Sequence, residues 1–235
     1  MTSFLAIETS SPACSVALQA GGLLISRYSE EPRSHTKLVM AMVNELLAEA
    51  KISVQQLNGI GVTIGPGSFT GLRIGFATVQ GLAFAADIPV VAISTMETLV
   101  ATYLRSQCAD QKNEGKIIVS VLDARMGEFN LGCYQVTAGG KLGSLAADQL
   151  LDAQQAMIFI EKYQPQMIVG EAGQLLTEHP VWVAKYAPVF PAAVDVLAMT
   201  ASAHASGLAQ PIETIELVYL RGTDAWQKRK RLRAV

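Results

Sequence analysis

The sequence predicts an α/β protein with two lobes, each a mixed β-sheet with flanking helices, the second lobe being reduced. Three observations support this prediction. Half of the 235 residues are hydrophobic and only 16% are charged, which supplies enough apolar material for a sizeable core. Apolar runs of strand length alternate with helical periodicity along residues 4–105, and a weaker version of the same order follows a polar stretch at 107–114.

The first lobe is predicted from three strands followed by alternating helices and strands. Turn residues at 10–12 and 21–22 separate the three strands, and three glycines separate a later strand from the helix that follows it. The two helices after the hairpins show leucine, valine and methionine at helical spacing. The predicted elements are strands at 4–9, 15–19 and 23–28, a helix at 36–50, a strand at 59–64, a helix at 71–86, a strand at 90–93 and a helix at 95–105.

The second lobe is predicted from a shortened copy of this order. Its elements are strands at 116–122 and 128–136 around a turn, a helix at 153–163, strands at 167–169 and 189–190, and a helix at 194–208. The expected domains are therefore residues 1–108, residues 109–214, and a C-terminal segment at 215–235. Three strands followed by alternating helices and strands, twice over, resembles the ribonuclease-H-like fold of actin, the Hsp70 chaperones and sugar kinases. Such a fold does not by itself give a function.

The charge distribution argues against non-specific nucleic-acid binding by the body of the chain. The formal net charge is −2, but residues 228–233 hold five of the 18 basic residues, which leaves 13 basic residues against 20 acidic ones elsewhere. An acidic body is a poor binder of phosphate backbones on its own. The basic tail could contact RNA or an acidic partner, or it could be a solvated terminus.

Neither a metal site nor a membrane segment is predicted. The three cysteines, Cys14, Cys108 and Cys133, lack CxxC spacing. The three histidines, His35, His179 and His204, lack HxxxH spacing. No secretory signal opens the chain, and its most apolar window is interrupted by polar residues and proline. We expect a cytoplasmic protein that uses no metal and no cofactor.

The glycine-rich loop at 65–71 has the layout of a phosphate cradle but fails its known spacings. A P-loop needs a lysine after its last glycine, where this chain has Leu72 and Arg73, and the dinucleotide fingerprint G-x-G-x-x-G also fails. A looser alternative stays open, in which Ser68 or Thr70 caps the helix and an anion binds its free N–H groups with help from Arg73.

The alternative for this segment is steric. Glycine costs about 1 kcal/mol relative to alanine inside a helix, so repeated small residues indicate close approach of another helix. Both helices, at 36–50 and 71–86, carry apolar residues over most of their circumference, which is typical either of a protein–protein face or of burial in the core alone. The predicted partner interface comprises Leu38, Met42, Leu46, Gly71, Arg73, Gly75, Thr78 and Leu82.

Five short runs together resemble the TsaB family, also called YeaZ, over essentially the whole chain. They are Ile7-Glu8-Thr9-Ser10, the run from Gly65 to Gly75, the run from Ala92 to Glu97, the run from Asp123 to Glu128, and Tyr219-Leu220-Arg221. The resemblance implies the actin/Hsp70-like ATPase fold. It also implies a role in making N6-threonylcarbamoyladenosine next to the anticodon of tRNAs that read codons beginning with adenine.

In that family the paralogue TsaD transfers the threonylcarbamoyl group from its adenylate. The resemblance implies that this chain is a non-catalytic partner of TsaD, docked through the two N-terminal helices. It further implies that TsaE joins the complex and that the chain contacts tRNA only as part of this complex. In the absence of TsaD, the chain is expected to form a homodimer.

Departures from the TsaD pattern agree with a non-catalytic role. The two metal-binding histidines of TsaD correspond to Thr95 and Leu99, and Pro12 and Ala13 stand where TsaD has acidic residues. Acidic residues of the second hairpin, Asp123 and Glu128, remain plausible site residues. The alternative is a stand-alone enzyme of this fold, either ATP-dependent or metallopeptidase-like.

Overall fold

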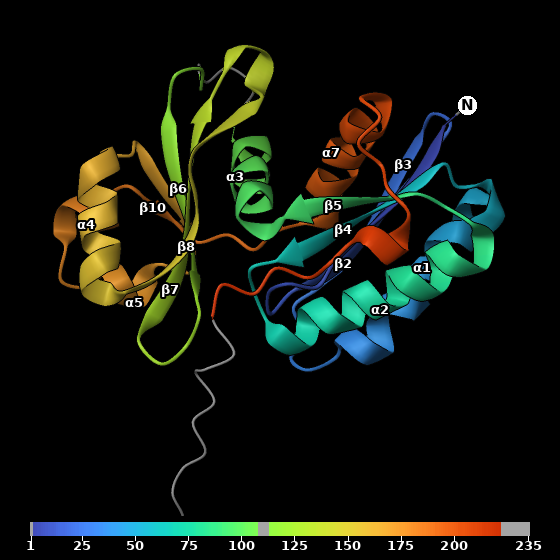
Figure 1. Cartoon of the computed structure of the whole chain (residues 1–235), viewed down its shortest axis with the longest axis horizontal. Coiled ribbons are helices and arrows are strands. Elements are labelled where there is room, and N and C mark those ends of the chain that lie inside the picture. Colours follow the sequence, from blue (N-terminus) through green and yellow to red (C-terminus); the bar gives the residue numbers. More distant parts are fainter. Residues whose placement is uncertain (1, 108–112, 222–235) are drawn as a thin grey trace, which may run out of the picture.

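Two five-stranded sheets lie side by side in the computed structural model, which describes residues 2–107 and 113–221 (Figure 1). The first lobe contains β1 (Ser3–Glu8), β2 (Cys14–Ala20), β3 (Leu23–Ser29), α1 (His35–Ala50), β4 (Gly59–Gly65), α2 (Phe69–Ala86) and β5 (Val90–Ser94), with α3 (Thr95–Ser106) following at its edge. The second contains β6 (Ile117–Asp123), β7 (Glu128–Val136), β8 (Leu142–Asp152), α4 (Ala153–Tyr163), β9 (Met167–Gly170), α5 (Gly173–Leu176), α6 (Pro180–Val183) and β10 (Tyr186–Ala187). The last long helix is α7 (Ala193–Ala205).

The two sheets have the same topology. The first has the order β3-β2-β1-β4-β5, with β1 antiparallel to β2 and parallel to β4. The second has the order β10-β9-β6-β7-β8, with β6 antiparallel to β7 and parallel to β9. Reversing the second order matches β1 with β6, β2 with β7 and so on through β5 and β10. The predicted fold class, with a repeated and reduced second half, is therefore confirmed.

Helices α1 and α2 cover one face of the first sheet, and their boundaries follow from local chemistry. α2 begins after Ser68, whose hydroxyl oxygen accepts a hydrogen bond from the Gly71 N–H. Lys51 and Asp87 end the two helices with left-handed backbone conformations, at φ of 55° and 52°. Val39, Val43 and Leu46 of α1 pack into the same buried cluster as Val79 of α2 and the strands beneath.

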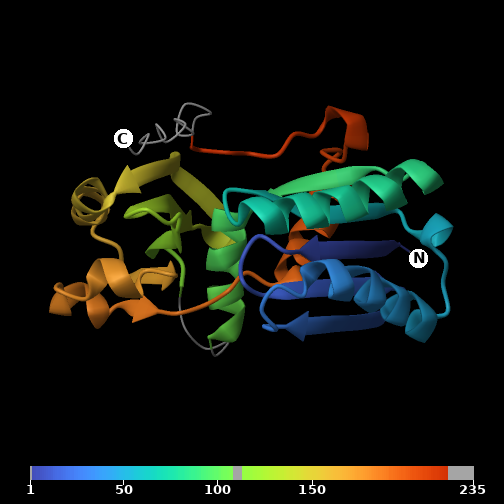
Figure 2. The ribbon, with the colours of Figure 1, turned by 90° about the horizontal axis from the view of Figure 1, so that it is seen from below.

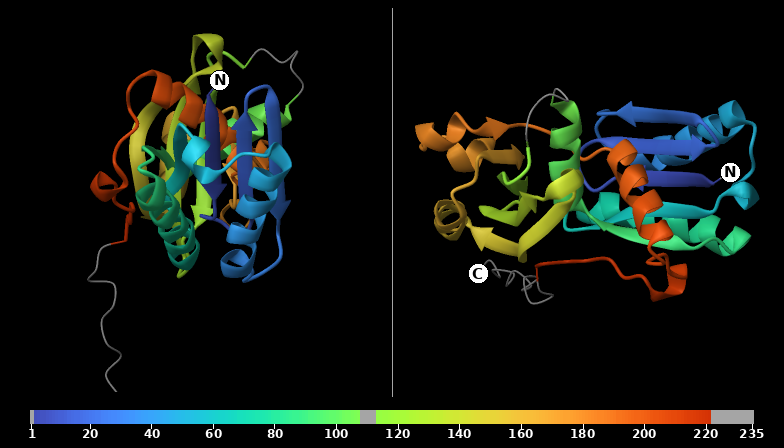
Figure 3. Two further views of the ribbon diagram at one scale, coloured as in Figure 1. Left: turned by 90° about the vertical axis from the view of Figure 1, so that its right-hand side faces the viewer. Right: turned by 90° about the horizontal axis from the view of Figure 1, so that it is seen from above.

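The opposite face of the first sheet is covered by α7, although this helix follows the whole second lobe in sequence (Figure 3). Its residues Ala193, Val196 and Leu197 share a buried cluster with Phe4 and Ile93 of the sheet. Thr200 lies so close to the sheet that only a glycine fits at position 61, where a Cβ would lie 1.8 Å from the Thr200 hydroxyl. We predicted this helix within the 109–214 lobe, and its packing places it with the first.

Three further differences from the sequence-based expectation occur in the second lobe. The long strand β8 and the short helices α5 and α6 had no predicted counterpart. The strand expected at 189–190 is wrong, because the chain pairs with β9 three residues earlier, at Tyr186 and Ala187. Pro188 follows directly and has no N–H with which to extend the ladder.

The lobes are joined by α3 and by a C-terminal segment. α3 stands between the two sheets, and its Met96, Leu99 and Tyr103 pack against Ile118 and Leu122 of the second sheet (Figure 1). Residues 215–221, which we name the strap, run alongside α2 from the first lobe toward the second (Figure 2). Within residues 2–107 and 113–221, no helix is long and apolar enough to cross a membrane. Cys108 and the basic tail at 228–233 lie outside the described residues.

Candidate functional site

A groove of about 490 Å³ lies between α1 and α2 on the outside of the first lobe. It is lined by Thr36, Val39, Met40, Phe69, Thr70, Arg73, Ile74, Ala77 and Thr78. Met40 and Phe69 are large apolar side chains that are 39% and 53% exposed. Such side chains at the rim of a groove mark a surface suited to another protein.

The exposed stripe along α2 extends this surface beyond the groove. Thr70, Arg73, Ala77, Gly81 and Phe84 recur at helical spacing and are all exposed, and Phe84 is 78% exposed. Arg73 is the one charged side chain among these five. A solvent-facing helix stripe is ordinarily rich in charged residues, so this composition favours a covered face. On α1, Ala41 and Ala48 are exposed, as Met40 is.

The residues predicted for the interface divide between the surface and the core. Met42 and Leu46 are buried in the first lobe, as are Gly71 and Gly75, so these four cannot meet a partner without rearrangement. This corrects the expectation for them. Half-buried Leu38 and Leu82 pack on the same core, whereas Arg73 and Thr78 line the groove. The predicted interface does not include Met40 and Phe69, which the structure exposes at the groove. The sequence does carry a signal for Met40, because this residue lies outside the apolar stripe that α1 turns to the core.

Gly71 and Gly75 of α2 are approached by a turn of the same chain, and not by another helix as the sequence predicts. A Cβ at Gly71 would lie 2.0 Å from the carbonyl oxygen of Thr9, and one at Gly75 would lie 2.3 Å from the Thr9 hydroxyl. A Cβ at Gly67 would lie 2.4 Å from the carbonyl oxygen of Ser10. The β1–β2 turn therefore sits directly on the glycine-rich segment.

Two N–H groups of the glycine-rich segment that a phosphate could use are already hydrogen-bonded within the chain. The Ser68 N–H donates to the carbonyl oxygen of Ser10 at 2.7 Å, and the Gly71 N–H donates to the Ser68 hydroxyl at 3.2 Å. Arg73 lies with its guanidinium 3.7 Å from the centre of the Phe69 ring and donates from Nε to the Tyr219 hydroxyl at 3.1 Å. The hydrogen bonds of the Ser68 and Gly71 N–H groups, and not the position of Arg73, disfavour the anion-binding alternative for the loop.

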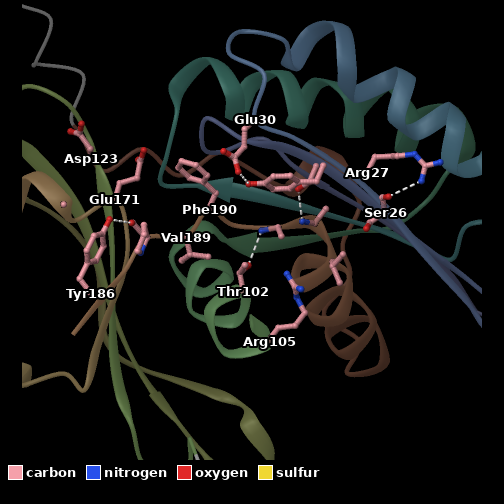
Figure 4. A pocket seen from close by; sticks show the side chains of 18 of the residues that line it. Ser26, Arg27, Glu30, Thr102, Arg105, Asp123, Glu171, Tyr186, Val189 and Phe190 are labelled. Atoms are coloured by element: carbon pink, nitrogen blue, oxygen red, sulfur yellow. Dashed lines mark hydrogen bonds between the residues drawn. The ribbon is translucent and has the colours of Figure 1, made fainter. Parts of the chain in front are cut away.

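A second concavity, of about 800 Å³, separates the lobes (Figure 4). Asp123, Glu171 and Tyr186 lie on its second-lobe wall, while Ser26 and Thr102 lie on the opposite side. Its three arginines are all matched by carboxylates. Arg27 pairs with Glu45 and Glu49, Arg105 pairs with Asp195, and Arg125 pairs with Asp123. A cleft whose cations are already neutralised is poorly suited to a polyphosphate.

The acidic residues that the sequence indicates as plausible site residues, Asp123 and Glu128, have separate environments, and Glu8 has a third. Asp123 lines the cleft, whereas Glu128 turns to the strap and pairs with Arg221. Glu8 is fully buried at the end of β1 and accepts hydrogen bonds from the Ser10 N–H at 2.7 Å and the Thr63 hydroxyl at 3.2 Å. Burial raises the Glu8 pKa to about 7.

The side chains of Thr95 and Leu99, which the resemblance places where TsaD has its metal-binding histidines, are both buried. In the part of the chain that the structure describes, no three His, Cys, Asp or Glu residues come together as a metal site would require. His35 hydrogen-bonds through Nε2 to the carbonyl oxygens of Ser11 and Ala13, each at 3.1 Å. His204 packs edge-on against Phe4. Both histidines thus have structural contacts.

Comparison with known proteins gives concordant results. A family model described as tRNA N6-adenosine threonylcarbamoyltransferase, TsaD, matches residues 28–210. The tRNA threonylcarbamoyladenosine biosynthesis protein TsaB of Escherichia coli K12 is 33% identical over 234 residues, which covers 95% of this chain and 96% of that protein. TsaB of Bacillus subtilis is 33% identical over 168 residues, covering 71% and 69% of the two chains. The solved structure of YeaZ from Pseudomonas aeruginosa superposes with a TM-score of 0.81 at 31% identity, covering 94% of this chain and all of that one.

Proposed function

The chain belongs to the TsaB family of tRNA threonylcarbamoyladenosine biosynthesis proteins, and we propose that it is a non-catalytic subunit that docks on TsaD through the outer face of α1 and α2. It acts in the formation of threonylcarbamoyladenosine in tRNA, as a subunit of the modifying machinery. In this proposal TsaD transfers the threonylcarbamoyl group to N6 of the adenosine next to the anticodon. TsaE joins the assembly, and tRNA is met through the complex.

The observation that carries the docking proposal is the composition of the exposed helical face. Met40, Phe69 and Phe84 are large, apolar and exposed, and the small residues Ala77 and Gly81 lie among them on α2. Small residues allow the backbone of a partner helix to approach closely, while the large ones supply the anchors that dominate interface energies. The same face would allow two copies of this chain to associate when TsaD is absent.

A non-catalytic role is supported by what the potential active-site elements do instead. The glycine-rich segment is packed under the β1–β2 turn, and the cleft arginines pair with this chain's own carboxylates. These groups serve the fold, so we assign the group transfer to TsaD.

The docking proposal is tested by placing a charge in the groove. Met40→Glu should weaken binding to purified TsaD at least 30-fold in calorimetric titration, about 2 kcal/mol for a lost apolar anchor, and should reduce tRNA modification by the assembled complex. Val181→Glu is the matched control, because Val181 is 68% exposed on α6 in the other lobe. Equal affinity of the two variants would exclude the groove as the docking site.

The interlobe cleft favours the rival function, a stand-alone ATP-dependent enzyme. Its volume of about 800 Å³ would accommodate a nucleotide. Titration of ATP into the isolated protein separates the two functions, because micromolar binding would support the enzyme and its absence would support the subunit.

A further inference from the structure

The exposed apolar surface of the groove does not end with the helices. Phe69, at the rim of the groove, has its ring centre 5.5 Å from that of Tyr219 in the strap. Tyr219 is 42% exposed, and its neighbour Val218 is 37% exposed. The strap is held in place here, since the Val218 N–H donates to the carbonyl oxygen of Ile64 at 2.8 Å. The apolar surface therefore continues from α2 onto a segment distant in sequence.

Two residues further on, the strap reaches the second lobe. Arg221 pairs with Glu128 and donates from Nη2 to the carbonyl oxygens of Ala124 and Arg125, at 3.1 and 3.2 Å. Its Nη1 lies 3.9 Å from the Met126 sulfur. Met126 is 84% exposed at the β6–β7 turn, and no other large apolar residue of the described chain is more exposed.

We propose that the TsaD-binding surface is continuous across both lobes, from Met40 through Phe69 and Tyr219 to Met126. This inference rests on the proposed docking function and extends it to the second lobe. The occupant is TsaD itself, held on one side by the α1–α2 face and on the other by the β6–β7 turn. A partner that contacts both lobes fixes their relative orientation.

The charges along this surface favour a protein over a nucleic acid. Arg221 is neutralised by Glu128, and Arg125 by Asp123, so they offer little net charge for phosphate groups. Arg73 is stacked on Phe69 and held through Nε by Tyr219, and no carboxylate pairs with it among the described residues. One pre-positioned guanidinium within an apolar surface suits a single carboxylate of a protein partner.

The inference is tested with full-length protein and purified TsaD by calorimetric titration. Met126→Glu should weaken binding at least tenfold, while Val181→Glu, which adds the same charge to an exposed apolar site of the same lobe, should stay within twofold of the original chain. Tyr219→Ala should also weaken binding at least tenfold. Tyr219→Phe, which keeps the ring against Phe69, should lose less than threefold. Thermal melts confirm that each variant is folded.

The outcomes separate this inference from the function on which it rests. If Met40→Glu weakens binding while Met126→Glu and Tyr219→Ala stay within twofold, the helices dock TsaD and the extension to the second lobe is wrong. If Met40→Glu has no effect, the docking function itself is wrong. A Met126→Glu variant that loses self-association in sedimentation, or tRNA affinity, but keeps TsaD affinity would assign the surface to a second copy or to RNA and overturn the proposal.

Discussion

The hydroxyl group of Thr9 donates a hydrogen bond of 2.8 Å to the carbonyl oxygen of Gly71, joining the β1–β2 turn to the first turn of α2. The two residues are 62 positions apart in sequence. Because the turn lies against the helix backbone, positions 67, 71 and 75 have no room for a side chain. The glycines are therefore required by the packing of a strand end on a helix, and they position α2 on the sheet.

Replacing Gly71 by alanine should destabilise the protein by about 3 kcal/mol, because the new methyl group would lie 2.0 Å from backbone that cannot easily move. Gly81→Ala in the same helix is the control. A Cβ there meets nothing within 4 Å, so this change should stabilise the protein by up to about 1 kcal/mol through helix propensity. Urea unfolding of both variants measures the difference, and equal stabilities would contradict the close packing of the turn.

Glu8 should make stability fall as the pH rises from about 5 to 7. Burial raises its pKa from 4.5 to about 7 in the folded protein, so between these values the folded state holds a proton that the unfolded state has released. Below pH 4.5 the Glu8 carboxyl is neutral in both the folded and the unfolded state. Above pH 7 it is charged in both, and the burial of this charge then lowers the free energy of unfolding by its full amount. The predicted loss is about 3 kcal/mol across this window, at 1.36 kcal/mol for each pH unit.

Glu8→Gln should remove this pH dependence, since the amide keeps an oxygen to accept from the Ser10 N–H and does not titrate. Unfolding free energies of both proteins at pH 5, 6 and 7 provide the measurement. The original chain should lose stability relative to the variant at each step upward. A constant difference between the two over this range would show that Glu8 does not titrate there.

Asp195→Ala should destabilise the protein by about 2 kcal/mol. The buried carboxylate of Asp195 accepts from the Thr102 hydroxyl at 2.8 Å and pairs with Arg105 Nε at 2.8 Å, which joins α7 to α3. This loss of stability is smaller than that for breaking a fully buried ion pair, because the Arg105 side chain is half exposed and can be solvated by water. Asp123→Ala, which breaks the more exposed pair with Arg125, should cost less than about 1 kcal/mol in the same thermal unfolding experiment. A reversed order would contradict this assignment.

The elements with strong local signals were predictable from sequence. α1 and α2 carry helical periodicity and were placed within two residues of their observed bounds, and β7 was placed at its observed bounds. β8 was missed because Leu142–Asp152 mixes small, polar and apolar residues without clear alternation. Its pairing with β7 contains register shifts, so tertiary contacts and not local pattern specify it.

The candidate site was predictable at the level of helices but not of residues. The excess of apolar residues on α1 and α2 indicated a second face, yet periodicity alone does not separate a core stripe from an exposed one. Periodicity therefore predicts Met42 for the interface, whereas Met40 is the exposed residue. The contribution that we propose for Tyr219 has no local signal, because its contact with Phe69 depends on the path of the strap from the first lobe to the second.

The placement of α7 bears on how the protein is synthesised. One face of the first sheet stays bare until residues 193–205 have left the ribosome, after the whole second lobe has emerged. The first lobe therefore cannot complete its folding during translation ahead of the second, as N-terminal domains commonly do. A chain that ends near residue 107 would expose Phe4, Val91 and Ile93 to water, and it would be a target for chaperones and proteases even though it contains every strand of its sheet.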